Sequence, residues 1–174
     1  MKVGRTTPLG VAYLPGPILG PGRAEVFERI LVAFDGSPES SNACRVAVEV
    51  ATRFQSSVTV ATVHPDASEA ADGQLERLVP LAEGKSLAVM IEELRASALA
   101  AGVRSFEPVY LYGEVVPSLL DYLASHPHDL AITGSRRLSR GRRLLAGSVS
   151  AGLVGEAPCP VLVVPARAVR RGTR

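Results

Sequence analysis

The segment between residues 134 and 150 has the residue types of an anion-binding site. It contains Gly134, the pair Gly147-Ser148 and Ser150, with a cluster of arginines over residues 136–143. Backbone N–H groups at a glycine turn and at the start of a helix can surround a phosphate, and glycines let the backbone come close to it. The same residues equally suit a strand end, a turn with a helix cap and a solvated loop. The local pattern leaves both interpretations open.

A second polar group, Asp35-Gly36-Ser37, follows the first apolar run of the folded region. The Asp35 carboxylate is suited either to hydrogen-bonding the nucleoside part of a nucleotide or to accepting backbone donors beside Ser37. Ser37 is a favourable N-cap residue, and Pro38 suits the first turn of a helix, where its missing N–H costs nothing. A helix is therefore predicted to begin directly after this group.

The histidines do not form a metal-binding or acid–base pattern. His64 follows a predicted strand, and no second ligand stands at useful spacing from it. His126 and His128 lie in a predicted turn between a helix and a strand, where we expect them to be exposed. We interpret all three as structural or solvated residues.

No nucleophile or thiol pattern suggests catalysis. Ser135 and Ser148 lack the Gly-x-Ser-x-Gly elbow of hydrolases, and Glu92-Glu93 belongs to the polar face of a predicted helix. Cys44 and Cys159 lack metal-ligand spacing, so they are predicted to be free thiols, which suit a reducing compartment.

The elements that must position these residues alternate between strands and helices. Short apolar, β-branched runs predict strands at 29–34, 57–63, 106–112, 129–133 and 160–164. Helices are predicted after Ser37, from Pro80 to Gly102, over 114–125 and from about Ser148. This order predicts an α/β fold, a doubly wound, five-stranded parallel sheet with helices on both faces, of the Rossmann-like type. Ligands on such sheets bind at the carboxyl ends of the strands where the strand order reverses, so Asp35-Gly36-Ser37 and 134–150 are expected there.

Helical periodicity also predicts which side chains face the sheet. In the first helix, arginines and a glutamate occupy the opposite face at four-residue spacing and are expected to pair: Arg45, Glu49 and Arg53. The predicted inward residues are Ala43, Val46, Ala47, Val50, Ala51 and Phe54 in the first helix; Leu87, Met90, Ile91, Leu94 and Ala98 in the second; and Val116, Leu119, Leu120 and Leu123 in the third.

Composition indicates one globular domain with short appendages. Apolar residues make up 47% of the 174 and charged residues 21%, and the net charge of +2 does not by itself indicate a nucleic-acid partner. The Gly- and Pro-rich residues 1–24 are predicted to be a flexible extension, 25–166 the folded domain and 167–174 a basic tail, either solvated or in contact with an acidic partner. No apolar run reaches the roughly 20 residues of a membrane-spanning helix, and the N-terminal residues do not have the layout of a secretory signal. We expect a cytoplasmic protein.

Three stretches give the chain a family resemblance. They are Ile30-Leu31-Val32-Ala33-Phe34-Asp35-Gly36-Ser37, Asp129 to Ser135, and Leu144-Leu145-Ala146-Gly147-Ser148-Val149-Ser150, followed by the ending Ala157 to Val164. In this order over Glu28 to Pro165, they resemble the universal stress protein family. The resemblance implies the Rossmann-like fold predicted above and an adenine nucleotide, ATP or AMP with or without Mg²⁺, as ligand.

The ATP-binding members carry Gly, two residues, Gly, nine residues, then Gly with Ser or Thr. The first glycine matches Gly134 and the closing pair matches Gly147-Ser148, but Arg137 stands at the second glycine. An arginine there loses the conformational freedom of glycine, although its side chain can itself hold a phosphate. The resemblance implies a nucleotide site made of Ala33, Asp35, Val63, Thr133, Gly134, Arg137, Gly147, Ser148, Val149 and Ser150.

These patterns, together with what the family resemblance implies, leave three functions of different classes. The first is a regulatory protein that responds to stress by binding an adenine nucleotide. The second is a homodimeric interaction protein that binds no nucleotide, paired through the apolar last strand over Val161, Leu162, Val163 and Val164, and Arg137 favours it. The third is an enzyme, a slow ATPase or phosphotransferase, for which the sequence offers no base.

Overall fold

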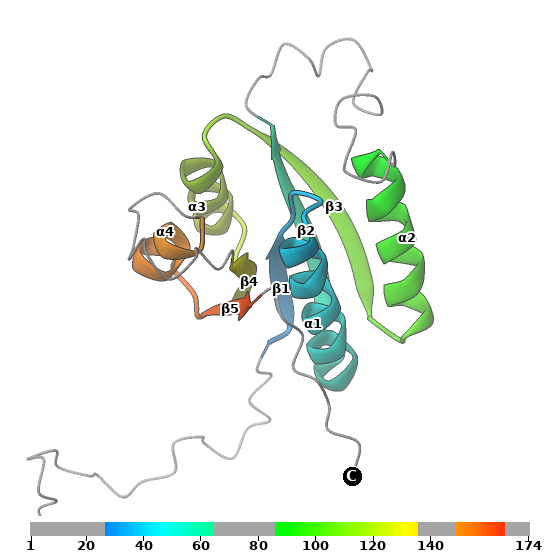
Figure 1. Cartoon of the computed structure of the whole chain (residues 1–174). Helices are drawn as coiled ribbons and strands as arrows, with labels where there is room; N and C mark the ends of the chain where they lie inside the picture. Colours follow the sequence, from blue (N-terminus) through cyan, green and yellow to red (C-terminus); the bar gives the residue numbers. More distant parts are fainter. Residues whose placement is uncertain (1–26, 65–85, 136–148, 166–174) are drawn as a thin grey trace, which may run out of the picture.

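The computed structural model describes residues 27–64, 86–135 and 149–165. Its centre is a sheet of five strands in the order β3-β2-β1-β4-β5, and every neighbouring pair is parallel (Figure 1). The strands are β1 (Arg29–Ala33), β2 (Ser57–His64), β3 (Ser105–Tyr112), β4 (Leu130–Ser135) and β5 (Val161–Pro165). The predicted strands and the predicted α/β class are confirmed. The extension 1–24 and the tail 167–174 lie outside the described residues.

Within the described residues, helices cover both faces of the sheet (Figure 1). The helices α1 (Pro38–Phe54) and α2 (Leu87–Ala100) pack on one face, and α3 (Val115–Ser125) and α4 (Val149–Glu156) on the other. Strand residues alternate between the two resulting cores, as a period of two requires. Ile30, Val32 and Val60 belong to the core under α1 and α2, whereas Leu31, Ala61 and Ala131 belong to the core under α3 and α4.

Helix α1 begins as the sequence predicts. The Ser37 hydroxyl accepts a hydrogen bond from the Ser40 N–H at 3.2 Å, and Pro38 occupies the first turn. The inward face is made of small buried residues, Ala43, Cys44, Ala47 and Ala51, which let the helix lie close to the sheet. Burial raises the pKa of the Cys44 thiol to about 12, so Cys44 is the free structural cysteine that was predicted.

The prediction for the end of α1 is wrong at Phe54. Its side chain is 51% exposed instead of buried, because the helix extends past the edge of the core at its last turn. The ring instead makes a T-shaped contact with Phe27, at a centroid distance of 5.5 Å and an interplanar angle of 86°. The helix ends at Phe54, and its C-cap residue Gln55 has a left-handed backbone with φ of 57°.

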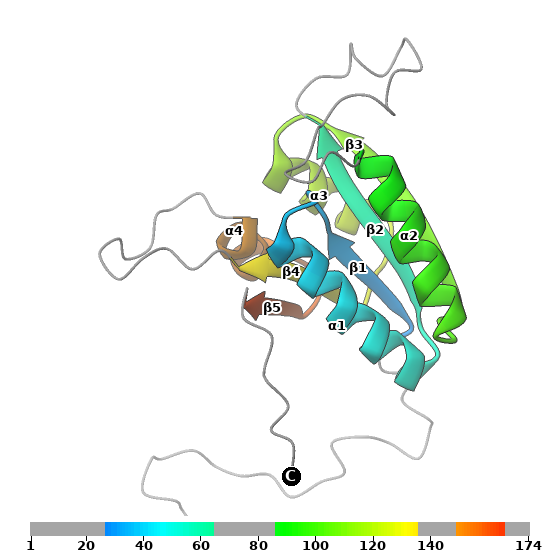
Figure 2. The same cartoon turned by 45° about the vertical axis from the view of Figure 1, so that its right-hand side comes forward.

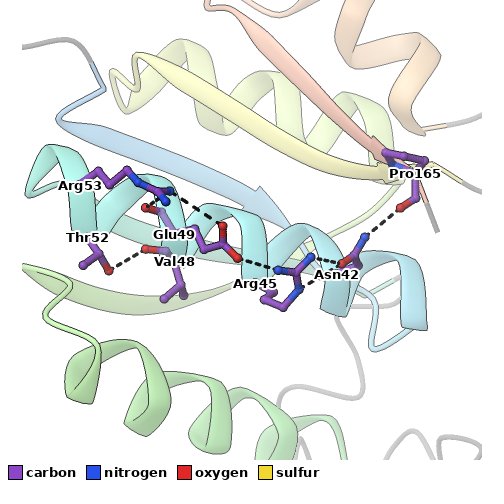
Figure 3. A network of polar contacts seen from close by, with 7 residues as sticks. All are labelled: Asn42, Arg45, Val48, Glu49, Thr52, Arg53 and Pro165. Atoms are coloured by element: carbon purple, nitrogen blue, oxygen red, sulfur yellow. Dashed lines mark hydrogen bonds and ion pairs between the residues drawn. The ribbon is translucent and has the colours of Figure 1, made fainter. Parts of the chain in front are cut away.

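The outer face of α1 carries the predicted charge pairs (Figure 3). Glu49 pairs with Arg45 at 2.6 Å and with Arg53 at 3.9 Å. At the other end of this network, the Asn42 amide donates to the carbonyl of Pro165 at 2.8 Å. The first turns of α1 are thereby joined to the last residue of β5.

Helix α2 begins at Leu87 and not at Pro80 as predicted. Ser86 is extended, with ψ of 153°, and its hydroxyl caps the helix by accepting from the Val89 N–H at 3.3 Å. Gly102 ends the helix as predicted, with φ of 90°. The Val103 N–H donates to the Ala98 carbonyl at 3.1 Å, and both side chains are buried, which is the Schellman arrangement.

The amino edge of the sheet is held by residues just before β4. The Asp129 carboxylate accepts from the N–H groups of Glu28 and Arg29, at 2.9 and 3.2 Å. His126 is exposed as expected, but His128 is partly buried, because its Nε2 lies 3.2 Å from the Thr59 hydroxyl of β2. Desolvation lowers the pKa of His128.

Candidate functional site

The strand order reverses between β1 and β4, which are neighbours in the sheet although two strands and three helices of the described residues lie between them in the sequence. From β1, the chain crosses to β2 and β3 on one side and to β4 and β5 on the other. The carboxyl ends of all five strands lie at one edge, because the sheet is parallel. In α/β sheets generally, the loops diverge at such a point and ligands bind there.

Most of the predicted site residues on the strands point to the same face. Ala33 at the end of β1 and Val63 near the end of β2 pack against the core under α3 and α4. In β4, Thr133 alternates with Ile132, a residue of the opposite core, so it belongs to this face too. The Thr133 side chain is only 3% exposed, and its hydroxyl is 3.4 Å from the Gly134 carbonyl.

Gly134 has a structural reason to be glycine. A Cβ at this position would lie 2.6 Å from the backbone carbon and 2.7 Å from the carbonyl oxygen of Glu39, in the first turn of α1. Helix α1 therefore fills the space beside Gly134 on its own face of the sheet. Any ligand at the end of β4 must lie on the other side, toward α4.

Asp35 makes one of the two contacts that the sequence allowed. Its carboxylate accepts a hydrogen bond from the Ser37 N–H at 3.0 Å, and its own N–H lies 3.4 Å from the Ser40 hydroxyl. Gly36 between them has φ of 76°, a left-handed conformation that favours glycine. The contact with Ser37 holds the carboxylate at the exposed carboxyl end of β1, and a carboxylate can accept more than one hydrogen bond.

Helix α4 brings the last part of the site to the same face. It contacts β4 and β5 (Figure 1). Val149 packs against the core under α3 and α4, and Ser150 in the first turn is partly buried. Arg137, Gly147 and Ser148 lie outside the described residues. The structure thus brings together Ala33, Asp35, Val63, Thr133, Gly134, Val149 and Ser150 at one edge.

One residue of this edge, Glu39, was missed by sequence reasoning. It follows Pro38 in the first turn of α1, and its backbone and Cβ lie against Gly134. The available signal was an acidic residue in a first helical turn, where the helix dipole favours negative charge. That signal concerns the helix and says nothing about a contact with β4.

Two features are absent from the described residues, a metal-binding cluster and a membrane-spanning helix. Over 27–64, 86–135 and 149–165, no group of three or more His, Cys, Asp or Glu residues could hold a metal ion. In the same ranges, no helix is long and apolar enough to cross a membrane.

A family model for universal stress proteins matches residues 27–165, which are the whole of the described sheet and its helices. The chain belongs to the universal stress protein family. Its relatives include a universal stress protein of Thermus aquaticus, 31% identical over 149 residues, which cover 80% of this chain and 99% of that protein.

Solved structures of the family share the fold. A universal stress protein in complex with cAMP has a TM-score of 0.62 at 22% identity, covering 82% of this chain and 99% of that one. An Arabidopsis thaliana family member with AMP bound has a TM-score of 0.54 at 20% identity, covering 80% and 92% of the two chains. These likenesses confirm the Rossmann-like architecture.

Proposed function

We propose that this universal stress protein binds an adenine nucleotide at the carboxyl edge between β1 and β4 and acts as a nucleotide-responsive regulator. The observation that carries the proposal is the meeting of Asp35, Thr133, Gly134 and the first turn of α4 at the reversal of strand order. Two structural relatives contain cAMP and AMP, which makes adenine nucleotides the ligand class to test first.

The geometry suggests how the ligand would lie. Because Glu39 closes the α1 side of Gly134, the nucleotide would lie on the face of Ala33, Val63 and Thr133. The nucleoside would hydrogen-bond Asp35, with the base beside Val63. The phosphates would lie at Gly134, Arg137, Gly147, Ser148 and Ser150, near the start of α4, where N–H groups and the helix dipole favour an anion.

A magnesium ion would arrive with the phosphates. The described residues offer no acidic cluster for it, and Mg²⁺ commonly binds through substrate phosphates and waters with few protein ligands. ATP is therefore best tested with and without Mg²⁺.

Calorimetric titration of the native chain with ATP, ADP and AMP tests the proposal, in parallel with an Arg137→Gly variant. We expect saturable heat from the native chain and weaker binding by Asp35→Ala, by about threefold to tenfold for one lost hydrogen bond. An Asp121→Ala variant, changed in an exposed carboxylate on α3, serves as the matched control. Binding by Arg137→Gly alone would reject the nucleotide function for this protein, and no heat from either chain at millimolar nucleotide would reject the site.

A second candidate function, a homodimer that serves as an interaction protein, is favoured by the edges of the sheet. Figure 2 shows β3 and β5 at opposite edges. Strand β3 carries Glu107 and Pro108 in its middle, and proline cannot donate to a neighbouring strand. Strand β5 has no proline before its last residue, and its Leu162 is 38% exposed, so β5 is the edge open to a second copy.

A further inference from the structure

Two buried polar atoms near the end of β2 lack hydrogen bonds. The Thr62 hydroxyl and the Nε2 atom of His64 are both buried and have no partner in the part of the chain that the structure describes. The Thr62 side chain is 3% exposed. An unsatisfied buried polar group costs about 1–3 kcal/mol, so two of them together at one place indicate a missing partner.

These atoms lie on the face of the sheet opposite the proposed nucleotide site. In β2, Thr62 and His64 alternate with Val63 and share the side of Val58 and Val60, which pack under α1 and α2. Ala33 and Val63 point to the other side. A molecule bound to Thr62 and His64 would therefore be separated from the nucleotide by the sheet.

Two tyrosines of β3 flank the pair. Tyr110 stands opposite Thr62 in the strand register, and Tyr112 stands opposite His64. The imidazole centroid of His64 is 6.0 Å from each phenol ring, at interplanar angles of 36° and 33°. Tyr112 is 37% exposed, so this aromatic group reaches the surface at the carboxyl edge of β3.

Thr62 and His64 offer a hydroxyl and an imidazole nitrogen as hydrogen-bonding groups. A threonine hydroxyl can donate or accept, and the Nε2 atom of a neutral imidazole does either according to the tautomer. The core on this face includes Phe34 and Leu87 and is apolar. A charged ligand would need an ionic partner in such surroundings, whereas a flat uncharged one needs only hydrogen bonds and ring contacts.

We propose that Thr62, His64, Tyr110 and Tyr112 form a second binding site, for a small, planar, uncharged molecule of the heteroaromatic-amide class. Thr62 and His64 hydrogen-bond the donor and acceptor atoms of the ligand, and the tyrosine rings contact its plane. The site is independent of nucleotide binding.

Ligand-observed saturation-transfer NMR on the full chain tests the site, with nicotinamide as the neutral probe and nicotinate as its charged counterpart of similar size. The informative variant is Thr62→Val, which removes the hydroxyl with little change of shape. The matched control is Thr59→Val, on the same strand but the opposite face, where the hydroxyl contacts His128 at 3.2 Å.

We expect the native chain and Thr59→Val to bind nicotinamide in preference to nicotinate. Thr62→Val should bind it about threefold to tenfold more weakly, as expected for one hydrogen bond. Without the probe, Thr62→Val should melt at or above the native temperature, since it removes an unpaired hydroxyl, whereas Thr59→Val should melt lower.

Three results would overturn the proposal. One is the absence of nicotinamide binding at millimolar concentration, or binding that Thr62→Val leaves unchanged. Another is a fall in the melting temperature of Thr62→Val as large as that of Thr59→Val, which would mean that the Thr62 hydroxyl is already bonded, for example to an ordered water. The third is competitive displacement of nicotinamide by AMP, which would place the probe in the nucleotide site.

Discussion

At the end of β4, the side of Gly134 that a Cβ would occupy is filled by the backbone of Glu39. Glycine at this position satisfies the packing of α1 whether or not a phosphate ever approaches it. A substitution of Gly134 is therefore expected to affect the stability of the fold, whatever its effect on ligand binding.

We predict that Gly134→Ala lowers the free energy of unfolding by about 1–3 kcal/mol, because the new methyl group would lie 2.6 Å from backbone that cannot rotate away. Urea denaturation measures this. Gly155→Ala is the control, since a Cβ there meets nothing within 4 Å, and alanine in a helix should add up to about 1 kcal/mol. Equal stabilities of Gly134→Ala and the native chain would contradict the close approach.

His128 gives the protein a pH-dependent stability. Desolvation is the largest cause of its lowered pKa; the His126 carbonyl and Asp129 act in the opposite direction, and Arg29 and His126 lower it further. A histidine with a lowered pKa in the folded state binds protons more readily when unfolded, so its stabilising contribution is complete above its ordinary value of about 6.5. That contribution should be lost as the pH falls from about 6.5 toward the folded pKa.

Denaturation curves measured from about pH 7.5 to about pH 5, a range that brackets the ordinary histidine pKa, check this prediction. His128→Asn should flatten the decline in stability, and His126→Asn, which removes only the smallest cause of the lowered His128 pKa, should preserve most of the decline. If the stability of His128→Asn falls with pH as much as that of the native chain, other groups cause the decline.

At the scale of elements, α3 and α4 approach each other through Gly152. A Cβ at this position would lie 2.6 and 3.0 Å from the two methyl groups of Val116. Here the obstacle is a side chain and not backbone, so removing it should restore the packing.

We predict that Gly152→Ala destabilises the protein by about 1–3 kcal/mol and that adding Val116→Ala recovers part of the loss. The double-mutant cycle should show a coupling of about 0.5–3 kcal/mol, because the two residues are in contact. Additive effects of the two changes would indicate that α3 and α4 are farther apart than the structure shows.

The element order was predictable because each element has a local signal. The β-branched runs, the Ser37-Pro38 cap and Gly102 mark strands and helix ends through contacts within a few residues. The start of α2 was not predictable in this way. The amphipathic pattern of 87–98 indicates which side of the helix is buried, whereas the cap at Ser86 determines where the helix begins. Phe54 was misplaced because periodicity does not reveal where a helix passes the edge of the core.

The candidate site was predictable only in part, for the same physical reason. The positions of Asp35, Thr133 and Gly134 follow from strand ends in a parallel sheet. The contact of Glu39 with Gly134 and the unpaired atoms of Thr62 and His64 depend on how closely separate elements approach. No local pattern specifies that distance.

At the scale of the whole molecule, the two edges of the sheet differ in their capacity to pair. We predict that the protein is a dimer and that Leu162→Lys makes it monomeric, because a charge on β5 would be buried in the new interface. Val154→Lys is the control, since Val154 is 61% exposed on α4. Light scattering of all three chains over a range of concentrations measures their mass, and a dimer that tolerates Leu162→Lys would exclude β5 as the interface.

The first turns of α1 contact both the proposed nucleotide site and the end of the edge strand β5. Glu39 lies against Gly134 at the proposed nucleotide site, and one turn later Asn42 donates to the carbonyl of Pro165 at the end of β5. If nucleotide and a second copy bind as proposed, a shift of these turns would change the contacts of both. Thermodynamic linkage makes the effect reciprocal: whatever factor nucleotide applies to the association constant of the subunits, association applies to the affinity for nucleotide.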